Sequence, residues 1–340
     1  MPVFSYLEPH PSATDALSQE DRERLNLLIA AVESDVEAWV NSSIACCDLC
    51  YDDFVSKWPL AYHREAKLQI DCIDRRVFYH GSKHVREEFG EPDFLRLWAF
   101  VGCPRCGEPM GGNIFPFEFP FSKASFFEEA FYKLGELAHN TPFLVLTSSV
   151  ARDIFEEVKN TSSKLSAGTP YKRLYRGRCI EKPTFDDFNA PPAPMVREGR
   201  YNHAGKPVLY LASDERTCWE ECRRPRDRFF ILEFFVQSPL VLLNFSDFDE
   251  LSNVLSALVY SSLMSSPTKS DGWNRPEYVL TRFVADCARA AGVDGIVYPS
   301  CRDSSGDNIV LLGPSKWKSA LKPVRITEFS SRRIPSNVAR

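Results

Sequence analysis

Two Cys-x-x-Cys pairs constrain the fold of this chain more than any other feature of its sequence. The first pair is Cys47 and Cys50, and the second is Cys103 and Cys106, which lie in a CPRCG turn. A pair of this spacing presents two thiolates to one metal, and two such turns complete a tetrahedral zinc site. We therefore expect Zn²⁺ to join two segments that are distant in the sequence. Because four thiolates leave no ligand position for water, the site is expected to be structural.

Other interpretations of these cysteines stay open at this point. Cys46, His63 or Cys72 could replace one of the four ligands, and a redox pair or unliganded thiols would show the same spacing. A secreted disulfide framework is not expected, because the chain is long and its eleven cysteines are odd in number. Six further cysteines lie among apolar neighbours and are interpreted as small core residues or unreactive thiols: Cys72, Cys179, Cys218, Cys222, Cys287 and Cys301.

The first half of the chain is predicted to be mostly helical. Apolar residues recur every three to four positions in residues 18–40, with Ser18 as the N-cap, and again in residues 125–139 and 149–159. The polar run KNTSSKLSAGTP, residues 159–170, has the composition of a surface linker. It separates two regions of different character.

The second half alternates short apolar runs with helical stretches, which predicts a mixed α/β domain. Strands are expected at KRLYRGR, KPVLYLA, FFILEFF, VLLNF, DGIVYPS and DNIVLLG, and helices around Thr217 and within residues 251–263 and 276–291. The fold class is therefore α+β. The expected domain boundaries are residues 1–160 for the helical domain, 161–170 for the linker, 171–328 for the mixed domain and 329–340 for a tail.

Composition places the chain among ordinary globular proteins, with 44% hydrophobic residues, 26% charged residues and a net charge of −5. This mild negative charge argues against a surface built to bind nucleic acid. No apolar run is long enough to span a bilayer, and the start, MPVFSYLEPHPSATD, lacks a basic segment followed by an apolar one. We therefore expect a cytoplasmic protein without a nucleic-acid or membrane partner.

Four ordered blocks in the second half resemble the RES domain, a family named for its arginine, glutamate and serine. The blocks are LYRGR, GRYNHAGKPVLYLASDERTCWEECRRP, PEYVLTRFVADCARAAGVDGIVYPS and GDNIVLL. The resemblance implies a fold related to ADP-ribosyltransferases and an enzyme that breaks the nicotinamide–ribose bond of NAD. Such an enzyme would be an NAD glycohydrolase, a phosphorylase or an ADP-ribosyltransferase. The resemblance also implies a toxin or defence effector that an antitoxin or another regulatory protein restrains.

Carried over residue by residue, the resemblance implies a catalytic set of Arg176, Tyr201, Glu221 and Ser300. The substrate NAD would be bound by Arg176, Arg200, Tyr201 and Ser300. Glu221 would stabilise the positive charge that builds on the ribose as the bond breaks, and the two arginines suit a pyrophosphate. Tyr201 is expected to stack on the nicotinamide ring, and Ser300 to bond its amide or a ribose hydroxyl.

Two positions near this set need a choice. Glu220 precedes Glu221 and stays open as an alternative, and Glu221 is chosen because the ECRRP that it begins resembles the family's glutamate followed by arginine and proline. Asn308 is expected to pin the last turn rather than to touch a ligand.

The helical first half resembles the HEPN-related region that precedes some RES domains. Active HEPN domains are ribonucleases with an arginine followed a few residues later by a histidine, and Arg75 and His80 in RRVFYH fit that spacing. Arg197 and His203 fit it too, as chance allows for so short a pattern. Two alternative functions therefore stay open. One is a HEPN-type ribonuclease, and the other is a binding module that zinc stabilises and whose RES fold is inactive.

Overall fold

The computed structural model describes residues 7–63, 72–168, 170–247, 251–265, 278–303 and 306–329. The chain divides into two compact units. The first comprises Met1–Tyr132 with Tyr260–Ser265, and the second comprises Lys133–Val259 with Ser266–Arg340. Within the described ranges, no helix combines the length and the apolar character needed to cross a bilayer.

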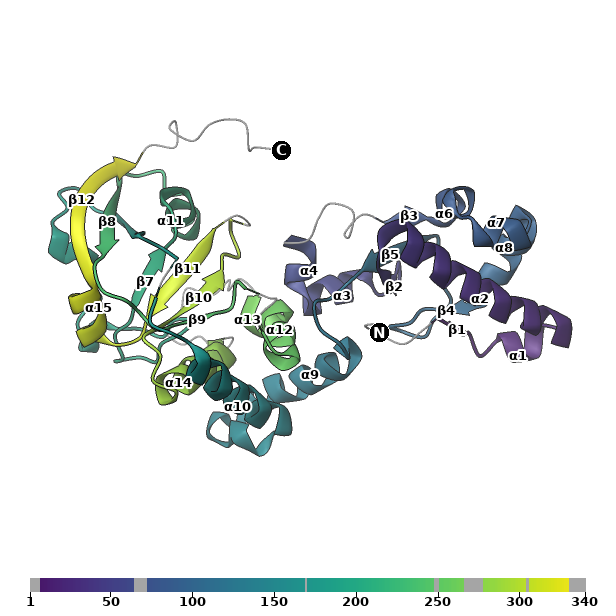
Figure 1. The fold of residues 1–340 in the computed structure, drawn as a ribbon, viewed down its shortest axis with the longest axis horizontal. Coiled ribbons are helices and arrows are strands. Elements are labelled where there is room, and N and C mark those ends of the chain that lie inside the picture. Colours follow the sequence, from purple (N-terminus) through teal and green to yellow (C-terminus); the bar gives the residue numbers. More distant parts are fainter. Residues whose placement is uncertain are drawn as a thin grey trace. The chain divides into compact units, whose positions relative to one another are not determined.

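The first unit is mainly helical and contains two small antiparallel sheets (Figure 1). Its helices are α1 (Ala13–Ala16), α2 (Gln19–Val40), α3 (Tyr51–Lys57), α4 (Pro59–His63), α6 (Arg75–Gly81), α7 (His84–Glu88), α8 (Glu91–Trp98) and α13 (Ser262–Ser265), and α9 (Ala124–Asn140) begins in it. Its strands are β1 (Glu8–Pro9), β2 (Ser43–Cys47), β3 (Ile73–Asp74), β4 (Val101–Gly102) and β5 (Asn113–Phe117). One sheet has the order β2-β5-β3, and β1 pairs with β4 in the other. The sequence predicts the helical character but not these short strands.

Helix α2 forms where the sequence predicts it. Ser18 is its N-cap, and the Ser18 hydroxyl accepts a hydrogen bond from the backbone N–H of Asp21 at 3.1 Å. Leu25 and Val32 are buried on the face that packs into the unit. The helix is followed by Asn41, whose backbone is left-handed (φ 49°). Asparagine adopts this conformation more readily than most residues, and the conformation ends the helix.

The second unit is built around one seven-stranded sheet (Figure 1). In sheet order the strands are β12 (Leu321–Phe329), β8 (Phe229–Val236), β6 (Arg173–Cys179), β7 (Leu209–Ala212), β11 (Asp307–Leu311), β10 (Gly295–Pro299) and β9 (Leu242–Asn244). All neighbouring pairs are antiparallel except β10 and β9, which are parallel. The six strands that the apolar runs predict are all present, and β12 is an additional edge strand.

Helices flank this sheet and cover part of its core. They are α10 (Ser149–Lys164), α11 (Glu215–Glu221), α12 (Asn253–Tyr260), α14 (Val279–Ala290) and α15 (Pro314–Ala320), with short 3-10 turns η1 (Pro142–Thr147), η2 (Phe185–Phe188) and η3 (Ala193–Met195). Helix α10 runs on to Lys164, into the stretch that the sequence indicates as linker. It lies against α14 (Figure 1). One face of the sheet, including Leu174, Leu232 and Ile309, packs with Trp317 of α15 in the main core of the unit.

The sheet opens between β6 and β7. Strand β6 pairs with β8 along its whole length, but it meets β7 at the single partner pair Tyr175 and Ala212. The Arg176 side chain lies in the opening and donates a hydrogen bond from Nη1 to the carbonyl oxygen of Tyr210 at 2.7 Å. A side chain thus replaces a ladder hydrogen bond at this point, which leaves space between the two strands.

Gly177 lies next to the opening, and its lack of a side chain is required by packing. A Cβ atom there would lie 2.1 Å from Cζ of the buried Phe229 ring and 3.0 Å from Sγ of Cys218. We expect Gly177→Ala to lower the free energy of unfolding of the second unit by about 1–3 kcal/mol, because the ring must move out of a packed core. Urea unfolding measures this loss.

The matched control for Gly177→Ala is Gly168→Ala in the same unit. Gly168 is exposed, and no described atom lies within 4 Å of a Cβ built on it. The control is therefore expected to change the free energy of unfolding by less than about 0.5 kcal/mol. Equal effects of the two substitutions would contradict the packing argument.

Candidate active site and cysteine cluster

The opening between β6 and β7 leads into a cavity of about 540 Å³. Its walls come from Tyr175, Arg176, Gly177 and Arg178 of β6, from Tyr210, Leu211 and Ala212 of β7, from Cys218, Glu221, Cys222 and Arg223 in and after α11, and from Gly199, Arg200, Tyr278, Tyr298, Cys301, Arg302 and Asn308. Segments that are far apart in the sequence therefore meet here. The volume is in the range of pockets that bind small molecules and cofactors.

Helix α11 delivers a glutamate to this cavity. Asp214 is the N-cap of this helix, and its carboxylate accepts hydrogen bonds from the backbone N–H of Thr217 at 2.8 Å and from the Thr217 hydroxyl at 2.7 Å. Glu221 is the last residue of the helix and lines the cavity. Its Oε1 accepts hydrogen bonds from the Ser300 hydroxyl at 2.5 Å and from Nδ2 of Asn308 at 2.7 Å. The carboxylate is therefore held in one orientation.

Ser300 acts on Glu221 rather than on the cavity. It is 5% exposed and is not among the residues that line the cavity. Its hydroxyl oxygen accepts hydrogen bonds from the backbone N–H groups of Arg302 and Asp303, at 3.1 and 3.0 Å, while its proton goes to the glutamate. The sequence resemblance implies that Ser300 hydrogen-bonds the ligand. In the structure, its hydroxyl instead holds the Glu221 carboxylate in position.

The neighbouring Glu220 lies in a different environment. It is buried, its Oε2 accepts a hydrogen bond from Nε of Arg224 at 2.6 Å, and it does not line the cavity. Of the two adjacent glutamates that the sequence leaves open, Glu221 is the one at the cavity.

Five arginines line the cavity, whereas Glu221 is the single carboxylate among its described lining residues. Arg176 is 9% exposed, and its Nε has no hydrogen-bond partner within the described part of the chain. The Nε of Arg178 likewise has none there. Burial, together with the nearby charge of Arg178, lowers the pKa of Arg176 to about 10, so it stays protonated at neutral pH. Buried donors without partners favour an anionic ligand at this wall.

Arg200 also lines the cavity, and the aromatic ring of Tyr278 packs against its side chain. Its guanidinium carbon lies 4.9 Å from the centre of the Tyr278 ring, a cation–π arrangement, and its backbone oxygen accepts a hydrogen bond from the Thr281 hydroxyl. Arg200 thus reaches the same cavity as Arg176 from a separate loop.

Tyr201 does not line the cavity, although the sequence expects it to stack on a ligand. It is 1% exposed, its ring centre is 4.7 Å from that of Tyr298, and its backbone N–H donates to the Tyr210 hydroxyl at 2.9 Å. Tyr210 and Tyr298 themselves line the cavity. Tyr201 therefore supports the wall from behind, and other tyrosines form its surface.

Two residues of this site differ from what the sequence predicts. Asn308, which was expected to pin the last turn, lines the cavity and donates a hydrogen bond to Glu221, and Arg178 was not singled out. A signal for Arg178 was present, because Arg176 and Arg178 are two positions apart on one strand and so share a face. Asn308 precedes the apolar run IVLL, at the point where that strand enters the site.

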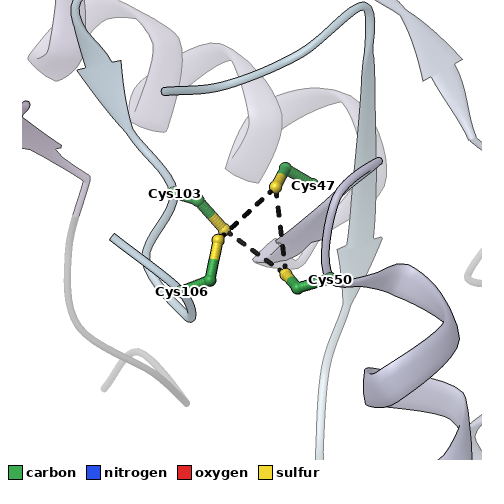
Figure 2. A group of neighbouring side chains, drawn as sticks. All are labelled: Cys47, Cys50, Cys103 and Cys106. Carbon is green, nitrogen blue, oxygen red and sulfur yellow. Dashed lines mark hydrogen bonds between the residues drawn. The ribbon is translucent and has the colours of Figure 1, made fainter. Parts of the chain in front are cut away.

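A second group lies in the first unit, where the two Cys-x-x-Cys pairs come together (Figure 2). The sulfur atoms of Cys47, Cys50, Cys103 and Cys106 all lie within 4.8 Å of one another. The sulfur–sulfur distance is 3.9 Å between Cys47 and Cys50, 3.7 Å between Cys47 and Cys106, and 3.8 Å between Cys50 and Cys103. These match the edge of about 3.8 Å that a tetrahedron with zinc–sulfur bonds of about 2.3 Å requires.

The backbone around the second pair forms the tight turn that such a site needs. Gly107 has a positive φ of 79°, and its N–H donates to the carbonyl of Cys103 at 2.9 Å. Arg105 joins the two pairs by donating from Nη1 to the carbonyl of Cys50 at 3.1 Å. Cys46 and Cys72 do not belong to the group, and the His63 side chain lies outside what the structure describes.

Arg75 and His80, the pair behind the ribonuclease alternative, both lie on α6. Nε2 of His80 is 3.9 Å from Oε2 of Glu91, and both residues are at least partly exposed. Arg75 and His80 are five positions apart on this helix, whereas side chains three or four positions apart are neighbours. The helix therefore does not place these two side chains next to each other. The other pair, Arg197 and His203, lies in the second unit, where Nε2 of His203 is 2.7 Å from Asp286.

Comparison with known proteins bears on the second half of the chain. The family model of the RES domain matches residues 173–331, which confirms the resemblance that the four sequence blocks indicate there. A comparison with curated proteins finds no match. Among solved structures, the chain is similar to the crystal structure of the M. tuberculosis MbcT–MbcA toxin–antitoxin complex, with 13% sequence identity and a TM-score of 0.32, over 52% of this chain and 93% of that chain.

Proposed function

We propose that the second unit, with its RES domain, is an NAD-processing enzyme that breaks the bond between nicotinamide and ribose. The observation that carries this proposal is the Glu221 carboxylate, fixed by Ser300 and Asn308 at the wall of an arginine-lined cavity. The RES match to residues 173–331 supplies the class of substrate. The proposed catalytic set is Arg176, Tyr201, Glu221 and Ser300, with Tyr201 and Ser300 as positioning residues.

The arginines suit the pyrophosphate of a dinucleotide. A guanidinium offers several N–H donors in a planar fork, which matches phosphate oxygens, and burial strengthens these charge-assisted bonds. Leaving a buried donor such as Nε of Arg176 without a partner costs about 1–3 kcal/mol. A bound phosphate group would remove that cost, and Arg200 would contact the ligand from the other wall.

The carboxylate suits the chemistry of the glycosidic bond. When the bond between the ribose carbon and the nicotinamide nitrogen breaks, its electron pair goes to the ring nitrogen, and neutral nicotinamide leaves. Positive charge builds on the ribose, and an anion held beside it stabilises this state. Because both hydrogen bonds reach Oε1 of Glu221, the carboxylate is oriented before the substrate arrives.

The test is proton NMR of NAD mixed with the full-length protein, in buffer with and without phosphate. We expect free nicotinamide to appear, at an initial rate proportional to the enzyme concentration. The co-product identifies the acceptor: ADP-ribose for hydrolysis, a phosphorylated ADP-ribose for phosphorolysis, and a protein adduct for transfer. Folded protein that binds NAD but releases no nicotinamide would contradict the proposal.

We further propose that Cys47, Cys50, Cys103 and Cys106 hold one structural Zn²⁺. The tetrahedral sulfur spacing supports this, and four thiolates leave no position for a reacting water. Zinc would join β2, the start of α3 and the turn after β4. A HEPN relationship of this first region and an antitoxin or regulatory partner stay predictions from the sequence resemblance.

A further inference from the structure

Three cysteines line the arginine-rich cavity: Cys218, Cys222 and Cys301. They differ in exposure, since Cys218 is buried, Cys301 is partly exposed and Cys222 is exposed. The reaction proposed above uses none of them. A thiol that borders a ligand cavity and is open to solvent can be reached by small electrophiles.

Cys222 occupies a special position at the end of α11. It directly follows Glu221, the last residue of the helix. The helix cannot continue beyond Cys222, because the next two residues, Arg223 and Arg224, have positive φ values of 63° and 51°. The chain therefore turns away sharply after Cys222. Cys222 is exposed and lines the cavity together with Glu221, the residue before it in the chain.

The surroundings of Cys222 favour a thiolate. Cys218 lies one helical turn earlier on α11, and Arg176 and Arg178 line the same cavity. Interaction with the Cys218 thiol and the positive charges of these two arginines lower the pKa of Cys222, whereas desolvation by the surrounding atoms and the nearby Glu221 raise it. In Cys301, by contrast, burial raises the pKa of the thiol.

We propose that Cys222 is a modification site that forms a mixed disulfide with anionic low-molecular-weight disulfides of the glutathione type. The Cys222 sulfur attacks one sulfur of the small disulfide, whose S–S bond breaks. The departing sulfur takes the electron pair and leaves as a thiolate, which water then protonates. One S–S bond forms for each that breaks, so no other oxidant is needed.

The charge of the cavity selects the kind of disulfide. Five arginines and one carboxylate line it, so a disulfide with carboxylate groups is attracted and a cationic one is repelled. The adduct would lie against the cavity wall formed by Cys222 and Glu221 and exclude ligands from the cavity. Formation of this adduct requires only the cavity and its thiols, whatever reaction the cavity performs.

The experiment treats the reduced full-length protein with oxidised glutathione and follows each cysteine by peptide mass spectrometry. The comparator is Cys179, which is also exposed and belongs to the same unit, but in which burial raises the pKa of the thiol. We expect Cys222 to form its adduct at least about tenfold faster than Cys179, because the thiolate is the reacting species. Equal rates at the two cysteines would overturn the proposal.

Two further measurements separate the causes. Cystamine, a cationic disulfide, is expected to react with Cys222 more slowly than oxidised glutathione does, and the reverse order would refute selection by charge. Cys218→Ala, checked for folding by circular dichroism, should slow the reaction at Cys222 because it removes the thiol that lowers the pKa of Cys222. An unchanged rate in this variant would show that Cys218 does not activate the thiol.

Discussion

Replacing Glu221 by glutamine is expected to lower the rate of nicotinamide release from NAD by about 10³-fold. Glutamine keeps the size of the side chain, and its carbonyl oxygen can still accept hydrogen bonds from Ser300 and Asn308. What is lost is the negative charge beside the ribose, where positive charge develops in the transition state. Initial rates by NMR or by chromatography of nicotinamide measure the effect.

The matched control is Glu220→Gln, one residue earlier on the same helix. Glu220 pairs with Arg224 and does not line the cavity, so this variant should keep most of the activity. Thermal unfolding of both variants separates loss of chemistry from loss of fold. Full turnover in Glu221→Gln, with loss in Glu220→Gln, would transfer the catalytic role to the neighbouring glutamate.

Zinc removal is expected to unfold the first unit. Structural zinc contributes roughly 10–16 kcal/mol to the folding of small zinc domains, which matches or exceeds the total stability of about 5–15 kcal/mol of a typical domain. Protein purified without chelator should contain one zinc per chain by elemental analysis. Cys103→Ser should lose this zinc. It should also lose protection against hydrogen exchange in β2, β4 and β5, because the turn after β4 is then held mainly by contacts such as the hydrogen bond from Arg105 to the Cys50 carbonyl.

The control for the zinc prediction is Cys72→Ser. Cys72 is exposed and lies outside the group of four sulfur atoms, so zinc content and exchange protection should stay unchanged. Metal-free protein whose first unit is equally protected against exchange would contradict a structural zinc.

Much of the second unit could be predicted from the sequence, because its central strands are nearly continuous apolar runs. FFILEFFV is β8, and VLYLA contains β7. Strand β12 could not be recognised, since it is a charged edge strand with an irregular register between Pro323 and Arg325. Proline, charge and irregular pairing are features that protect sheet edges, and they also remove the apolar pattern by which strands are found.

Only part of the candidate site's membership, and none of its geometry, could be predicted from the sequence. The order of the sequence blocks indicates Arg176, Glu221 and Ser300, and the structure brings these three together. It could not indicate that Tyr201 lies behind the wall, because that depends on where β6 and β7 separate. The clustering of the four cysteines was easier to predict, since a Cys-x-x-Cys motif fixes its own local geometry.

The Glu221 carboxylate is fixed by groups that follow much later in the chain. Ser300 comes after β10, and Asn308 lies in β11, near the end of the sequence. During synthesis on the ribosome, the glutamate, Arg176 and Arg200 all emerge well before these two anchors. A chain interrupted before β11 would carry the charged groups but could not aim the carboxylate. For a protein with the activity proposed above, only chains translated beyond Asn308 would hold the carboxylate in place and consume NAD.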